Sequence, residues 1–131
     1  MKKLLIFLFS ILISFNSYGE WKEIGENING TIYYIEMDKI KEHDGYVYWW
    51  YLSNFLKPID SVEMVGMMSQ KIYLQGDCEI TRFKMLSIIS YNQPMGEGEF
   101  HSSSLPNPEW NYAVPESTSE IMLDYVCDYV D

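Results

Sequence analysis

The sequence predicts an α+β domain in which about six mostly antiparallel strands precede one C-terminal helix. Three observations support this prediction. Runs rich in aromatic and β-branched residues alternate with turn residues over most of the chain, and residues 46–55 form the strongest run. Residues 118–130 instead repeat acidic residues every four positions, as a helix with one polar stripe does. The only two cysteines, Cys78 and Cys127, lie in these two different parts of the chain.

The first 19 residues have the layout of a secretory signal peptide. Lys2 and Lys3 precede an apolar run over residues 4–15, and small residues, Ser17 and Gly19, stand at the expected processing site. A membrane anchor is the alternative, but about a dozen apolar residues are fewer than the roughly 20 that span a bilayer. We therefore expect cleavage after Gly19 and an exported single domain over residues 20–131.

The central part of the chain is predicted to be a series of strands joined by turns. The strands expected in order are 21–24, 31–36, 46–55, a stretch around Ile72 and Leu74, 80–91 and 99–102. Asp38 begins one expected helical turn, and Asp44-Gly45 marks a turn. Pro58 is expected to end the third strand, and Gly76-Asp77 to form a two-residue hairpin turn. Residues 102–115 are expected to be irregular.

The C-terminal helix has a well-marked start and an unfavourable end. Ser117 followed by Glu120 is a capping box, and Pro115 stands just ahead of it. Residues 118–130 then combine a narrow acidic stripe with a wide apolar face. Acidic residues in the last turn oppose the helix dipole. A tertiary contact is therefore expected to hold this end, where Cys127 lies.

Two cysteines in an exported chain of this size indicate one disulfide, Cys78 to Cys127. A thiol nucleophile or a metal site is the alternative, but no C-x-x-C motif or Cys/His spacing accompanies them. The closed loop of about 50 residues corresponds to on the order of 4 kcal/mol in the chain-entropy treatment. Arg82, the only arginine, is expected to form a structural ion pair with Asp77 or with the acidic stripe of the helix.

One helix is too narrow to cover the predicted sheet. Six strands spaced about 4.8 Å apart span roughly 24 Å, whereas a helix is about 10 Å across. Tyr46, Tyr48 and Trp50 share one face of the strongest strand, and the residues between them, also apolar or aromatic, share the other. Large exposed aromatic patches mark interaction surfaces, so these three residues are the candidate binding residues. Sheet curvature or a homodimer would bury both faces instead.

The charge balance excludes some partners. The chain carries 19 acidic and nine basic residues, a formal charge of −10, and loss of the leader lysines would make it more acidic. Nucleic acid and anionic membrane surfaces recruit clusters of Lys and Arg, so neither is expected as a partner. Cationic or neutral partners, including proteins, remain open, and the acidic excess also favours solubility.

No catalytic or metal site is predicted, and the chain is not expected to be an enzyme. The two histidines, His43 and His101, have no recognisable nucleophile or metal partner in the sequence. Three methionines, Met64, Met67 and Met68, are a possible copper(I) site through their thioethers. Methionines in such a segment more commonly fill gaps under a loop, and we favour that interpretation.

A set of residues runs in order through nearly all of residues 20–131. It comprises Trp50, Leu52, Ser69, Lys71, Asp77-Cys78, Arg82, Tyr91, Gly96, Gly98, Trp110, Pro115-Glu116-Ser117 and Cys127. In order and spacing these residues resemble the surface-adhesin protein E family, small exported proteins of Gram-negative bacteria. The resemblance implies a curved antiparallel sheet with a C-terminal helix tied to its concave face by a Cys78–Cys127 disulfide.

The same resemblance implies binding of host matrix or plasma proteins at the bacterial surface, with dimerisation and haem binding. A lipidated cysteine at the processing site would anchor such a protein, but Glu20 occupies this position. The expected location is therefore the periplasm, the cell surface or the medium. Two functions are predicted from these features: a cell-envelope protein that binds a protein partner through a sheet face, or a periplasmic accessory protein such as an inhibitor or a haem carrier.

Overall fold

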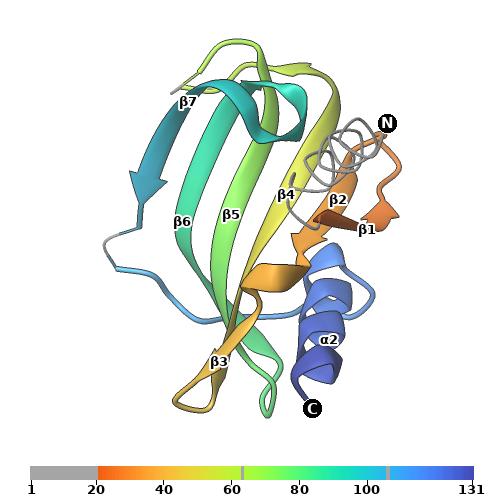
Figure 1. Ribbon diagram of the computed structural model, residues 1–131, viewed down its shortest axis with the longest axis vertical. Helices are drawn as coiled ribbons and strands as arrows, with labels where there is room; N and C mark the ends of the chain where they lie inside the picture. The colour runs from red at the N-terminus through yellow and green to blue at the C-terminus, as the bar shows by residue number, and fades with distance from the viewer. Residues whose placement is uncertain (1–20, 63, 106) are drawn as a thin grey trace, which may run out of the picture.

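In a computed structural model, residues 21–62, 64–105 and 107–131 are described, and they form an antiparallel sheet with one helix packed against it (Figure 1). The predicted signal peptide lies outside these residues. The strands are β1 (Trp21–Glu26), β2 (Ile32–Glu36), β3 (Lys41–His43), β4 (Tyr46–Ile59), β5 (Met67–Asp77), β6 (Arg82–Gln93), β7 (Glu97–Ser104) and β8 (Asn111–Tyr112). Two 3₁₀ turns, η1 (Met37–Lys39) and η2 (Pro94–Gly96), and the helix α2 (Thr118–Val130) complete the described elements. No helix in this part of the chain is long and apolar enough to cross a membrane.

The sheet is built by chain neighbours that pair antiparallel. Its order is β1-β2-β4-β5-β6-β7, with the short β3 beside β4 and the short β8 beside β6. Figure 1 shows β4, β5 and β6 as a long curved centre, with β7 at one edge and β2 and β1 toward the other. The connection after β7 passes the lower ends of β6 and β5 before it reaches α2 (Figure 1). The predicted α+β fold is therefore confirmed.

The core lies between one face of β2, β4 and β5 and the apolar side of α2. It contains Ile35, Val47, Trp49, Tyr51, Ile72 and Leu74 from the sheet, and Met122, Leu123 and Val126 from the helix. The packing is close: a methyl group on Gly76 would come within 2.7 Å of both Leu123 and Trp49. Full burial of a large apolar side chain such as Leu123 stabilises the fold by about 1.5–3 kcal/mol. The helix is therefore held mainly by the burial of its apolar face.

The helix begins and ends where the sequence predicts. Ser117 is the N-cap, and its side chain accepts a hydrogen bond of 3.3 Å from the backbone N–H of Glu120. The Glu120 carboxylate in return accepts from the backbone N–H of Glu116, one residue before the cap. Two backbone donors near the first turn are thereby satisfied by side chains.

Two predicted details of the strands are wrong, and two short strands were not predicted. β4 continues through Pro58 to Ile59, because Pro58 lies in an irregular stretch where the ladder with β5 is interrupted, and no donor is needed there. The hairpin turn follows Asp77 rather than including Gly76, since both residues pair with β6. The short strands β3 and β8 were not predicted, because their composition is polar or irregular and only pairing with β4 and β6 defines them.

Candidate functional site

The strand β4 separates two environments. Val47, Trp49 and Tyr51 point toward α2 and are at most 8% exposed. Tyr46 and Trp50, with Tyr48 between them, point the other way and are only partly buried. Among the described residues no helix lies on that second side, which we call the helix-free face. The alternation of β4 therefore places the three candidate binding residues together on a surface that the core does not use.

Aromatic side chains from three elements meet on the helix-free face. Tyr48 and Trp50 both stack on Tyr73 of β5, with ring centroids 6.2 and 4.8 Å apart. At the other end, Tyr46 lies 5.5 Å from the ring of Trp110. The register explains the central contact, because Trp50 and Tyr73 are directly paired across β4 and β5. The face thus carries a row of aromatic rings from Trp110 to Trp50.

Basic side chains flank this aromatic row. Arg82 and Lys84 of β6 lie over the ring of Trp110, 4.2 and 4.4 Å from its centroid, within cation–π range. One register row across β6, β5, β4 and β3 consists of Lys84, Gln75, Tyr48 and Lys41. With strands about 4.8 Å apart, the two lysines at the ends of this row are roughly 14 Å apart at the backbone.

A hollow of about 320 Å³ opens on this face beside β3. Lys41, Glu42, His43, Tyr48 and Tyr73 line it. The hydroxyl of Tyr73, like that of any ordinary tyrosine, is protonated at neutral pH. Partial burial raises the pKa of Tyr73 further, and the neighbouring Tyr48 adds to this effect. The hollow therefore offers phenolic hydroxyls and basic side chains as hydrogen-bond donors. Glu42 pairs with Val47, so alternation directs its side chain toward the opposite side of the strand.

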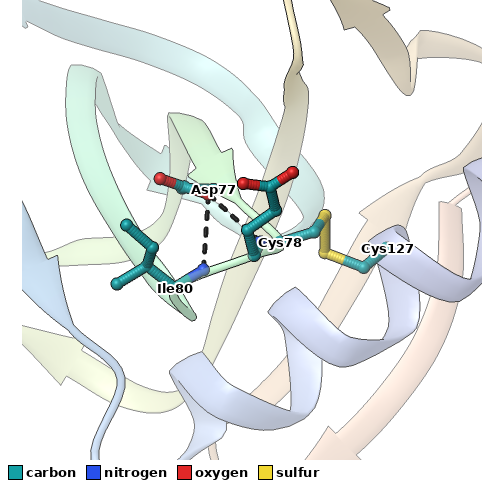
Figure 2. Close-up of a disulfide and its surroundings, with 5 residues drawn as sticks. Asp77, Cys78, Ile80 and Cys127 are labelled. Atoms are coloured by element: carbon teal, nitrogen blue, oxygen red, sulfur yellow. Dashed lines mark hydrogen bonds between the residues drawn. A yellow bond between two sulfur atoms is a disulfide. The ribbon is translucent and has the colours of Figure 1, made fainter.

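Asp77 organises the end of β5 at which the disulfide is attached. One carboxylate oxygen accepts from the backbone N–H groups of Glu79 and Ile80, at 3.1 and 3.4 Å (Figure 2). The other accepts from Nε of Arg82 at 3.0 Å, which is one of the two ion pairs expected from the sequence. Cys78 follows directly and is bonded to Cys127 of α2, with Cα atoms 5.9 Å apart (Figure 2).

The η2 turn folds over the other end of the helix-free face. The hydroxyl of Ser69 donates to a main-chain carbonyl of β6 and accepts from the N–H of Gly96, at 2.6 and 2.9 Å. Gly96 lies so close to Lys71 that an added methyl group would be 2.6 Å from its Cε. The ammonium group of Lys71 lies between the rings of Trp21 and Tyr91, at 5.5 and 5.4 Å. This end of the face is therefore closed by structural contacts.

The model of the surface-adhesin protein E family matches residues 21–128 of this sequence. The chain belongs to this family. Among curated proteins, none matches it. Solved structures of Haemophilus influenzae protein E are similar in fold: crystal form II has a TM-score of 0.66 at 16% identity and covers 83% of this chain and 87% of that one. A second structure of the same protein has a TM-score of 0.66 at 16% identity, with 83% and 84% coverage. Protein E from non-typeable H. influenzae has a TM-score of 0.63 at 17% identity, with 82% and 75% coverage.

The residues that carry the resemblance to the adhesin E family divide into two groups in this chain. Ser69, Lys71 and Gly96 hold the η2 turn, and Cys78 with Cys127 ties the helix to the sheet, so these residues maintain the fold. A smaller group lies on the helix-free face: Trp50 and Trp110 are the ends of the aromatic row, and Arg82 lies over the ring of Trp110. The disulfide implied by the resemblance is confirmed.

The other candidate chemistry is dispersed in this adhesin E domain. His43 lies 3.1 Å from Asp44 at an exposed hairpin tip, whereas His101 is on β7, opposite Ser90. Met67 and Met68 are consecutive in β5, so their thioethers point to opposite faces of the strand. The two sulfur atoms are therefore not placed to bind one copper ion together. Within residues 21–62, 64–105 and 107–131, no group of three His, Cys, Asp or Glu side chains is placed to hold a metal ion.

Four residues of the face were not singled out as binding residues from the sequence: Lys41, Tyr73, Lys84 and Trp110. The position of Tyr73 could have been predicted from the sequence. It alternates with the apolar Ile72 and Leu74, which are buried, and therefore lies on the opposite side of the strand. Lys41 belongs to a short polar strand with no pattern of its own. Trp110 reaches the face from an irregular connection, and only the tertiary fold brings it to Tyr46.

Proposed function

We propose that this chain is an adhesin-like protein of the cell envelope that binds a protein partner through Tyr46, Tyr48 and Trp50. The observation that carries the proposal is the asymmetry of the sheet. The only described helix covers the face with Trp49, and the opposite face holds a row of partly exposed aromatic rings. Aromatic residues are enriched at the centre of protein interfaces, because they bury large areas at a small entropy cost.

Membership of the surface-adhesin protein E family supports the same proposal. We propose host matrix or plasma proteins as the partner class and the cell surface as the location. We propose no catalytic role. Protease treatment of intact cells, compared with release by osmotic shock, tests the location. Protection from the protease with full recovery in the shock fluid would contradict surface display and favour the periplasmic accessory protein.

The binding test compares three proteins on a panel of immobilised matrix and plasma proteins. A triple variant, Tyr46→Thr, Tyr48→Thr and Trp50→Thr, removes the rings but keeps residues that favour strands. A matched control, Tyr129→Gln, removes an aromatic side chain that is 53% exposed on α2. We expect the triple variant to bind at least tenfold more weakly and the control to bind as the wild type does. Equal binding by all three proteins would contradict the proposed surface.

A small-ligand carrier is the second candidate, and the hollow beside β3 favours it. His43 and Tyr48 belong to residue types that ligate haem iron, and Lys41 offers a partner for a carboxylate of the ligand. Titration with haemin, followed by absorbance, tests this role. A saturable spectral change that His43→Ala reduces would support it, and an unchanged spectrum would exclude it.

A further inference from the structure

The fold gathers most of the basic residues of this acidic chain on one face. Seven basic residues occur among residues 21–131. Four of them lie on the helix-free face: Lys41, Lys71, Arg82 and Lys84. The helix on the opposite side carries the exposed carboxylates of Asp124 and Asp128. A net charge of −10 therefore conceals a locally basic surface, which the sequence composition alone did not indicate.

The basic residues at one end of that face have few carboxylate partners. Arg82 is paired with Asp77, but among the described residues Lys41 and Lys84 form no ion pair. They stand at the two ends of the row that crosses the sheet through Gln75 and Tyr48. An unpaired ammonium group at either end of a row of hydrogen-bond donors is complementary to a ligand with several separated negative charges.

We propose that this basic-aromatic patch, defined as Lys41, Tyr48, Tyr73, Lys84 and Trp110, binds an acidic polysaccharide of the matrix type, a linear chain that carries sulfate and uronate groups. The aromatic rings offer apolar edges for the C–H surfaces of the sugar rings. The phenolic hydroxyls and the Gln75 amide donate to sugar hydroxyls. Lys41 and Lys84 contact anionic groups on separate sugar units along the chain.

A saccharide fits this patch better than an acidic peptide does. Extended peptides bind sheets at an open edge, through main-chain hydrogen bonds. The centre of the patch, at Tyr48 and Tyr73, lies instead where β4 and β5 have already paired their main-chain groups. What remains available there are side-chain donors and aromatic rings, which suit a ligand covered with hydroxyl and anionic groups.

This inference rests on the proposed role of the helix-free face in binding, but it does not require that the partner be a protein. The two are tested with different ligands. Failure on the protein panel leaves the saccharide result intact, and failure with free saccharides leaves the protein result intact.

The experiment uses calorimetry and NMR with the processed chain and defined probes. The probes are a heparin hexasaccharide, a chondroitin sulfate hexasaccharide, uncharged maltohexaose and a short poly-L-glutamate. We expect saturable binding of a sulfated probe that weakens as NaCl is raised, with backbone amide shifts concentrated at Lys41, Tyr48, Tyr73 and Lys84. Maltohexaose and poly-L-glutamate are expected to bind at least tenfold more weakly.

Two charge-matched variants locate the site. Lys41→Gln with Lys84→Gln removes both ammonium groups of the patch, and we expect at least a tenfold loss of affinity. Lys22→Gln with Lys57→Gln makes the same charge change at exposed positions outside the patch, and we expect less than a threefold loss. Equal losses in the two variants would overturn the assignment of the site. Absence of saturable binding to either sulfated probe, or tighter binding of poly-L-glutamate, would overturn the proposed ligand.

Discussion

Replacement of Cys78 and Cys127 by serine measures how much of the fold depends on the tie between sheet and helix. The two cysteines are 49 residues apart, so the disulfide closes a loop of about 50 residues. By the chain-entropy relation, the unfolded chain without this disulfide has about 14 cal/mol/K more conformational entropy. The free energy of unfolding is therefore lower by about 4 kcal/mol at 25 °C. The unfolding entropy of this domain is about 2.1 cal/mol/K per residue. Division of the lost free energy by this entropy gives a Tm roughly 15–20 °C lower.

The helix is nevertheless expected to remain in place without the disulfide. Met122, Leu123 and Val126 are 3%, 1% and 0% exposed, and each contributes about 1.5–3 kcal/mol through burial. The double serine variant should therefore keep the far-UV spectrum of the wild type at 20 °C and unfold in one cooperative transition at a lower temperature.

Circular dichroism during thermal unfolding is the assay, and wild-type protein in excess reductant is the matched control. Both the variant and the reduced wild type should show the same decrease in Tm. A decrease of less than about 4 °C would refute the reasoning that the disulfide acts by restricting the unfolded chain. Loss of helical signal at 20 °C would refute the conclusion that apolar burial holds α2.

Three further predictions follow from the packing and the buried polar groups. Gly76→Ala places a methyl group 2.7 Å from Leu123 and Trp49 and should destabilise by about 1–3 kcal/mol in urea unfolding. Gly25→Ala, where the added methyl group has nothing within 4 Å, is its control and should change the free energy of unfolding by less than about 1 kcal/mol. Ser69→Ala leaves the N–H of Gly96 without its hydroxyl acceptor and should cost about 1–3 kcal/mol. Burial raises the pKa of Tyr51 above its usual value near 10, so the folded state keeps a proton that the unfolded state releases. Stability should therefore fall as pH rises above about 10, and Tyr51→Phe should flatten this decline in urea midpoints between about pH 9 and 11.

Each of these predictions has an outcome that contradicts it. Equal stability of the two glycine variants would show that the space around Gly76 can expand at little cost. An unchanged Ser69→Ala protein would mean that η2 is held by other contacts. The same alkaline slope in Tyr51→Phe and the wild type would mean that Tyr51 ionises in the folded state as readily as it does in the unfolded state.

The sequence predicted the parts of the fold that depend on local patterns. The helix was located from the Ser117 cap and the spacing of its acidic residues, and the two faces of β4 were assigned from alternation alone. The predicted turn at Gly76-Asp77 failed because Asp77 acts through its side chain. Its carboxylate accepts from the two N–H groups that follow Cys78, which moves the reversal of the chain beyond the cysteine.

The candidate site was predicted only in part, because it depends on long-range pairing. Tyr46, Tyr48 and Trp50 share one strand, so their common face follows from a period of two. Lys41 and Lys84 are 43 positions apart in sequence, and only the pairing of four strands aligns them in one row. Charge counting predicted no basic surface because it averages over the whole chain, whereas the fold gathers Lys41, Arg82 and Lys84 at one end of the helix-free face.

The alternation of β4 has a consequence for how this protein can diverge. The side chains of Val47, Trp49 and Tyr51 belong to the core, whereas those of Tyr46, Tyr48 and Trp50, which alternate with them, do not. Substitutions at Tyr46, Tyr48 and Trp50 can therefore alter what the surface recognises while the packing under α2 is preserved. Two sets of residues interleaved along one strand can be selected separately, one for folding and one for recognition.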